Sequence, residues 1–264
     1  MKQPFRYYLL FLIPAVLCMG TLPAQAQLKG ILDHVLHKKD SNQPAVSGTA
    51  LPSAAAPSST EISTGVKQAL EIGLQDGIKQ VSAVDGFFKN ALIKVVFPPE
   101  AQRIEQTLRG IGLGSLCDKA ILSFNRAAES AAKEAAPIFT QALKQMTLRD
   151  ATQLLLGPDT AATSYFKRTT TAELKSKFRP VIESNLEKAG ATRYWGDMMN
   201  RYNQLPLVKK VNPDLSDYVT QKAIDGLFVM VAEKEKEIRG QLGARTTPLL
   251  QKVFGYAAQQ KGKE

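Results

Sequence analysis

The chain of 264 residues contains few of the side chains on which enzymes most often rely. Its only histidines are His34 and His37, and its only cysteines are Cys18 and Cys117. Both histidines precede a Ser/Ala/Pro-rich stretch at residues 40–57, so Ser-His-Asp or Cys-His catalysis in the following domain would lack its base. Two histidines three positions apart can share a metal ion, but no further cluster of ligands follows them. We therefore predict no catalytic residue, no metal site and no cofactor.

Paired carboxylates are the one catalytic chemistry that the sequence leaves open. Glycoside cleavage needs only two acids at a suitable separation. Asp214 and Asp217 are candidates, although their place before a helical segment also suits them to cap it. A carboxylate-based hydrolase is therefore kept as a second alternative function.

Arginine and tyrosine side chains beside apolar helix faces are the candidate ligand-binding groups. Residues 164–180, SYFKRTTTAELKSKFRP, concentrate five basic residues among aromatic ones. Arginine presents a forked array of donors that suits phosphate or carboxylate. The candidates are Arg126, Tyr165, Arg168, Arg179, Tyr202 and Arg245. Together with Asn125, Glu129, Tyr218 and Asp225, the same residues would otherwise form a hydrogen-bonded network buried between helices.

The stretch at residues 164–180 contains a capping pattern at Thr170 and Glu173, which predicts that a new helix starts there. A short connection usually turns consecutive helices against each other. Arg168 and Arg179 would then either reach one groove as a two-pronged anion site or pair separately with surface carboxylates such as Glu183.

Helix start and stop signals recur along residues 58–256. Ser58 with Glu61, and Thr147 with Asp150, fit the capping box. Apolar residues recur at helical spacing between these signals, most clearly over residues 215–240, and only residues 91–98 resemble a strand. Further boundaries are expected at Pro98–Pro99, Gly110, Ser115, Pro137, Asp214, Gly240 and Pro248. We predict an all-α fold, with one multi-helix domain of bundle-like or orthogonal packing.

Residues 1–26 have the three-part layout of a secretory signal peptide. A short basic region precedes an apolar run at residues 7–22, and Ala24-Gln25-Ala26 forms a small-x-small cleavage site. The apolar run is too short for a comfortable membrane span. We predict cleavage before Gln27, a periplasmic or secreted protein, and no transmembrane helix after cleavage; an uncleaved anchor and lipidation of Cys18 are the alternatives.

The mature chain would have four parts. Residues 27–39 form an amphipathic segment that either packs on the main domain or contacts a membrane surface or partner. Residues 40–57 form a flexible linker, residues 58–256 the helical domain, and residues 257–264 a polar tail. Loss of residues 1–26 leaves Cys117 as the only thiol, so no internal disulfide can form, and we expect this thiol to be buried.

Positive charge is the main compositional clue to partners. The net charge is +10, and it falls to +8 when residues 1–26 are removed. Outside the cytoplasm the available polyanions are anionic lipids and wall polymers, so we expect one of these or an envelope protein as partner, and no nucleic acid.

Seven stretches carry a resemblance that spans residues 61–256. They are PPEAQRIEQTLRGIGLG, SFNRAAESAAKEAAPIF, LKQMTLRDATQLLLG, TSYFKRTTTAELKSKFRPVIE, YNQLPLV, DYVTQKAIDGLFVMVAEKEKEIR and ARTTPLLQKVFG. In order and spacing the chain resembles the bacterial family of domain of unknown function 4197. The resemblance implies an exported or envelope-associated helical protein, and it carries over no activity, ligand or catalytic residue.

Three functions remain open at this point. The first is a non-catalytic periplasmic protein that binds an envelope partner or an anionic polymer. The alternative is a helical carrier of an apolar or amphipathic, lipid-like ligand, and the second alternative is the hydrolase. A void of several hundred Å³ would favour the carrier, two facing acids the hydrolase, and a solid core the binding protein.

Overall fold

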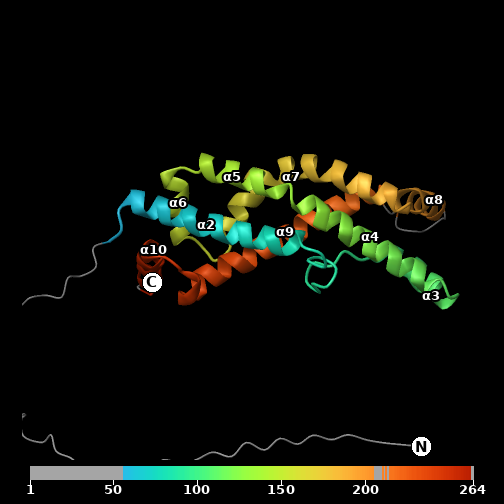
Figure 1. Cartoon of the computed structure of the whole chain (residues 1–264), viewed down its shortest axis with the longest axis horizontal. Helices are drawn as coiled ribbons and strands as arrows, with labels where there is room; N and C mark the ends of the chain where they lie inside the picture. Colours follow the sequence, from blue (N-terminus) through green and yellow to red (C-terminus); the bar gives the residue numbers. More distant parts are fainter. Residues whose placement is uncertain (1–55, 205–209, 211, 213, 263–264) are drawn as a thin grey trace, which may run out of the picture. The chain divides into compact units, whose positions relative to one another are not determined.

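The computed structural model describes residues 56–204, 210, 212 and 214–262. The predicted signal peptide, the amphipathic segment and most of the linker lie outside these residues. Within them the chain forms nine α-helices and no β-strand, which confirms the all-α prediction (Figure 1). The helices are α2 (Ser59–Ser82), α3 (Gln102–Gly110), α4 (Gly114–Ala132), α5 (Ala135–Gln145), α6 (Leu148–Leu156), α7 (Ala161–Lys188), α8 (Ala191–Asn203), α9 (Leu215–Gly240) and α10 (Pro248–Lys261).

The capping signals act as their residue types predict. The Ser58 hydroxyl accepts the Glu61 N–H, and the Glu61 carboxylate accepts the Ser58 N–H in return. Thr147 and Asp150 form the same reciprocal pair at the start of α6. Each box satisfies backbone donors that a helix start leaves without an intrahelical partner.

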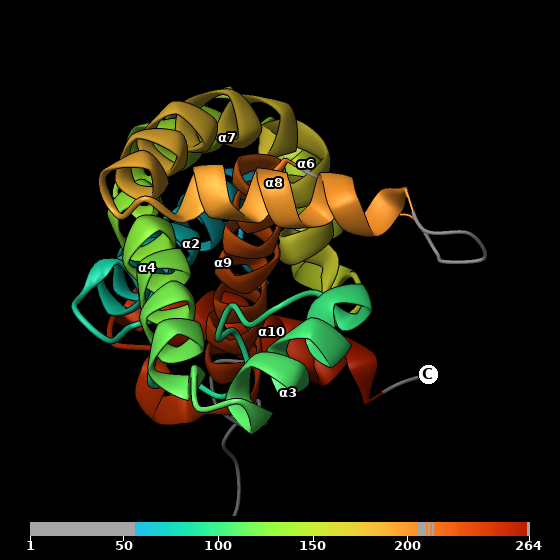
Figure 2. The same ribbon diagram turned by 90° about the vertical axis from the view of Figure 1, so that its right-hand side faces the viewer.

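Helix α9 lies at the centre of the domain. It packs against α2, α4, α7 and α8. In Figure 2, α9 runs behind α8, with α4 and α7 beside it. Its buried positions include Val219, Leu227 and Val231 and also Gly226 and Met230, so more than one stripe of the helix faces other helices. A helix that is covered on several sides needs apolar residues on several sides.

The helix start predicted at Thr170 is wrong. Helix α7 runs without interruption through Thr170 and past Pro180. Thr170 is buried, and its hydroxyl donates to the Phe166 carbonyl one turn earlier instead of capping a new helix. Leu174 and Phe178 continue the buried face, so tertiary packing overrides the local capping preference.

Two other boundaries and one strand-like stretch differ from the expectations. The break between α4 and α5 falls at residues 133–134, and Pro137 lies in the first turn of α5. Helix α10 continues to Lys261, past residue 256, where we placed the end of the domain. Residues 91–98, which resemble a strand in the sequence, form none; the backbone of Val95 in this stretch pairs with a side chain of α4. Buried Asn125 accepts the Val95 N–H at 2.9 Å and donates to the Val95 carbonyl at 2.8 Å.

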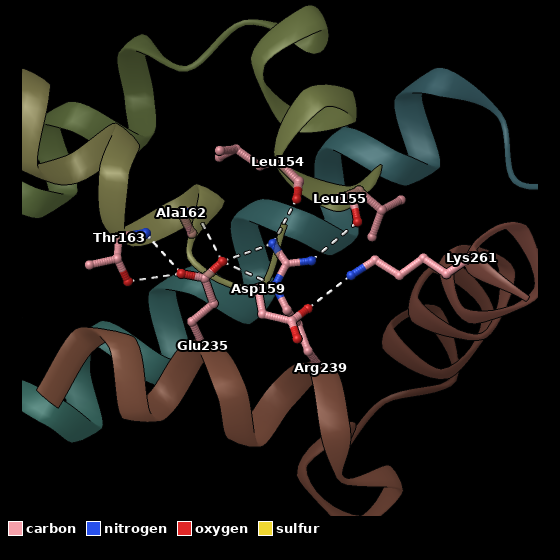
Figure 3. A network of polar contacts seen from close by, with 8 residues as sticks. All are labelled: Leu154, Leu155, Asp159, Ala162, Thr163, Glu235, Arg239 and Lys261. Carbon is pink, nitrogen blue, oxygen red and sulfur yellow. Dashed lines mark hydrogen bonds and ion pairs between the residues drawn. The ribbon is translucent and has the colours of Figure 1, made fainter. Parts of the chain in front are cut away.

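A buried ion pair joins three helices (Figure 3). The Glu235 carboxylate on α9 accepts the N–H groups of Ala162 and Thr163, both at 2.9 Å, in the first turn of α7. Arg239 donates to Glu235 at 2.8 Å and to the carbonyls of Leu154 and Leu155 in the last turn of α6. The negative charge thus faces a helix N-terminus and the positive charge a helix C-terminus, as the helix dipoles favour.

Candidate functional site

A cavity of about 570 Å³ is lined by residues of α3, of α4 and of α8. Phe97, the turn of Ala189 and Gly190 after α7, and Leu215, the first residue of α9, complete its wall. Figure 1 shows α3 and α8 at the same end of the domain, away from α6 and α10. Its volume lies within the ~300–1,000 Å³ typical of small-molecule sites.

Three aromatic rings form one side of the cavity. Phe97 and Phe124 meet edge to face with centroids 5.6 Å apart, and Trp195 of α8 lies 6.0 Å from Phe97 and 6.5 Å from Phe124. The hydrogen bonds between Asn125 and Val95 hold the segment that carries Phe97 against α4. Trp195 is 3 % exposed, so this side is rigidly packed and apolar.

Small residues also line the cavity. They are Ala120 of α4, Ala189 and Gly190 in the turn between α7 and α8, and Ala191, the first residue of α8. Gly190 has a φ of +68°, and its N–H bonds to the Glu187 carbonyl. A left-handed residue directly after a helix is most readily a glycine, so the turn into α8 and the free volume depend on the same residue.

The rim and the interior differ in polarity. Cys117 is 1 % exposed in the native state, and burial raises the pKa of its thiol, so the expectation of a buried cysteine is confirmed. Leu116 is 54 % exposed at the rim. Among the described lining residues, Lys119 is the only charged side chain and Ser123 the only hydroxyl. Such a lining can exclude water from an apolar group, but it offers no acid and base for a reaction.

Two of the predicted ligand-binding arginines are held by carboxylates. Arg126 donates to Glu129 at 2.6 Å and to Asp85 at 2.7 Å. Glu129 also accepts the N–H groups of Phe87 and Phe88, so Arg126 belongs to a network that fixes the chain after α2. These ion pairs raise the pKa of the Arg126 guanidinium.

Arg179 bonds to Asp214, the N-cap of α9, and lies 3.5 Å from Asp217. It therefore pairs with carboxylates of another helix instead of with Glu183 of its own. Arg168 is exposed and lies over the Tyr165 ring, 5.7 Å from its centroid. Because α7 is continuous, the eleven-residue step from Arg168 to Arg179 separates them by about 16 Å along the axis. They do not form the two-pronged site that two helices would have allowed.

Of the other candidates, Tyr165 and Arg245 lie apart from the cavity, and the side chain of Tyr202 is outside the described part of the structure. Tyr165 is buried in the core, with its hydroxyl 3.4 Å from the Ala142 carbonyl, and burial raises its pKa. Arg245 is buried after α9, where it donates to the carbonyls of Ile238 and Arg239, and desolvation lowers its pKa. Tyr202 lies in α8.

Sequence reasoning missed the aromatic residues of the cavity. Trp195 is the only tryptophan of the chain, which could have drawn attention to it. Its partners Phe97 and Phe124 lie far from it in the sequence, and an aromatic residue at helical spacing indicates a core as readily as a cavity.

Among the described residues, no group of three or more His, Cys, Asp or Glu side chains is placed to hold a metal ion. No described helix is long and apolar enough to cross a membrane.

Residues 56–255 match the model of the family described as protein of unknown function (DUF4197). The chain belongs to this family. The matched DUF4197 region contains every residue that lines the cavity. No curated protein and no solved structure matches the chain.

Proposed function

We propose that this DUF4197 protein is a non-catalytic carrier that holds an apolar or amphipathic molecule in the cavity between α3, α4 and α8. The observation that carries the proposal is the cavity itself, with about 570 Å³ of space beside three aromatic rings. On the basis of the N-terminal sequence, we propose that it acts in the periplasm or outside the cell.

The lining favours binding over catalysis. None of the described residues that line the cavity is a carboxylate or a histidine. Asp214 and Asp217, the acids considered for a hydrolase, are engaged in capping α9 and in ion pairs with Arg179 and Lys175. The arrangement therefore supports a carrier better than the hydrolase.

Local ion pairing weakens the case for an anionic polymer as the main ligand. Lys175 and Arg179, from the basic stretch of α7, both pair with acids of α9. Lys252 pairs with Glu61, and Lys261 with Asp159. Charges paired in this way attract a polyanion less than free charges would. Binding of an envelope partner or polymer stays a prediction from the composition.

A hydrocarbon chain is the simplest occupant of such a cavity. Each methylene group removed from water contributes about 0.8 kcal/mol, so eight of them contribute about 6 kcal/mol before the cost of association. With aromatic contacts added, we expect dissociation constants in the micromolar range, roughly 8 kcal/mol of binding free energy.

Trp195 fluorescence gives a direct test. Because Trp195 is the only tryptophan and lines the cavity, titration of the purified protein with dodecanol should change its emission in a saturable way. Ala120→Phe fills the cavity and should weaken binding at least tenfold. Ala136→Phe introduces the same ring at an exposed position of α5 and serves as the matched control.

The two variants separate the outcomes. A loss of affinity in Ala120→Phe alone, with circular dichroism and melting temperature like those of Ala136→Phe, would support the carrier. No saturable binding to the wild-type protein, or equal binding to both variants, would refute it.

A further inference from the structure

A second, more polar hollow adjoins the apolar cavity. It has a volume of about 270 Å³ and lies between α4 and the last turns of α7. The two hollows share Lys119, Ser123 and Ala189 in their linings, so they meet along one side of α4. We call the second hollow the polar groove. Leu122, Arg126 and Asn185 complete its lining.

The polar groove has a positive character. Two of its lining side chains, Lys119 and Arg126, are cations, and no carboxylate lines either hollow among the residues whose side chains the structure describes. Arg126 is already neutralised by Asp85 and Glu129. Asp118, the neighbour of Lys119 in sequence, bonds to Arg109 at 2.8 Å and is therefore engaged elsewhere.

Lys119 is the free cation of this arrangement. It is exposed, and it forms no ion pair with any of the residues that the structure describes. Because Lys119 lines both hollows, its ammonium group lies where the polar groove adjoins the apolar cavity. An ammonium group on a flexible stem can reach an anionic head while the cavity holds an attached chain.

We propose that the ligand of the cavity is a single-chain anionic amphipath. Its hydrocarbon part lies against Phe97, Phe124 and Trp195, and its carboxylate or phosphate lies in the polar groove at Lys119. Ser123 and Asn185 are the neutral polar side chains of the groove beside this head group. This inference rests on the proposed carrier function and adds the chemical class of the ligand and its direction in the site.

The test compares ligands that share a chain and differ in the head. Dodecanoate and dodecyl phosphate carry an anionic head, and dodecanol carries a neutral one. By Trp195 fluorescence, both anions should bind the wild-type protein roughly three- to tenfold more tightly than dodecanol, as expected for one partly exposed charge contact. High salt should reduce this advantage and leave dodecanol binding unchanged or stronger.

Lys119→Gln should remove the advantage of both anions over dodecanol, measured as the ratio of the dissociation constants within the same variant. Lys133→Gln is the matched control, because Lys133 is also exposed and follows the last residue of α4, far along the helix from the cavity. It should keep the advantage. Inorganic phosphate should not displace dodecanoate, since a head group without a chain lacks the apolar contacts.

Three results would overturn the inference. Dodecanol binding as tightly as dodecanoate would leave the cavity as a carrier site but remove the role of the head group. Equal anion affinities in Lys119→Gln and the wild-type protein would exclude Lys119 as the head-group ligand. Displacement of dodecanoate by inorganic phosphate would point to a site for free anions. If none of the three chain ligands binds, the carrier function fails as well.

Discussion

Removal of the Glu235 carboxylate should be among the most damaging single changes to this domain. The Glu235 side chain is 3 % exposed, and it accepts three hydrogen bonds from Ala162 and Thr163 at 2.8–2.9 Å. Its ion-pair partner Arg239 is itself only 12 % exposed. Glu235→Ala would therefore leave buried donors of α7 without an acceptor and a buried cation without its counter-charge.

The size of the effect follows from these contacts. Breaking a buried ion pair by removing one partner costs about 3–5 kcal/mol of unfolding free energy. Arg239 keeps its bonds to the carbonyls of Leu154 and Leu155, so we expect the lower end, about 3 kcal/mol. For a domain of this size, that corresponds to a fall in melting temperature of about 6–12 °C.

Urea unfolding followed by circular dichroism measures the change. Glu237→Ala is the control on the same helix, because Glu237 is half-buried and only pairs with Lys234 at 3.0 Å. We expect it to cost under about 1 kcal/mol. Should Glu235→Ala cost no more than the control, the ion pair does not hold α6, α7 and α9 together in the way its geometry indicates. Ligand affinity should be unchanged, since the network contributes no residue to the cavity lining.

Two further predictions concern helix packing and acid stability. Gly226→Ala should destabilise the domain by about 1–3 kcal/mol, because the new Cβ would lie 2.6 Å from a ring atom of buried Phe87. In the same unfolding assay, Gly255→Ala should stabilise the domain by about 0.5–1 kcal/mol, because its new Cβ would meet no heavy atom within 4 Å. The hydrogen bond from Lys252 and the cap at the start of α2 lower the pKa of Glu61 from 4.5 to about 2. The stabilising contribution of the Glu61 carboxylate is therefore complete above pH 4.5 and is lost as the pH falls toward 2. The melting temperatures of the wild-type protein and Glu61→Gln should converge over that range. A melting-temperature difference that stays constant would contradict this.

Local signals in the sequence determined much of the secondary structure. The capping boxes at Ser58 and Thr147 and the proline at the first position of α10 predict helix starts, because the groups that satisfy a helix end lie within three residues of each other. The sequence also predicts the buried positions of α9, because apolar residues recur there at the spacing of a helix. The family resemblance, carried by motifs along the chain, was confirmed by the match over residues 56–255.

The failure at Thr170 shows where local reasoning ends. A threonine followed by a glutamate three residues later fits a cap, but the same hydroxyl can bond to the carbonyl four residues back inside a helix. The choice depends on whether Phe166 and Phe178 share one buried face, and that face exists only because α4 and α9 cover it. Arg179 likewise finds its carboxylates on α9, 35 and 38 residues away, and not one turn along its own helix.

The sequence by itself determined the helical class, most helix ends and the shortage of catalytic side chains, because these depend on residue types and short spacings. Only the tertiary structure decided that Phe97, Phe124 and Trp195 share a cavity and that Lys119 lies beside it. A cavity is the space that side chains from several helices fail to fill. No local pattern records it, since each of its walls, taken alone, has the composition of an ordinary core.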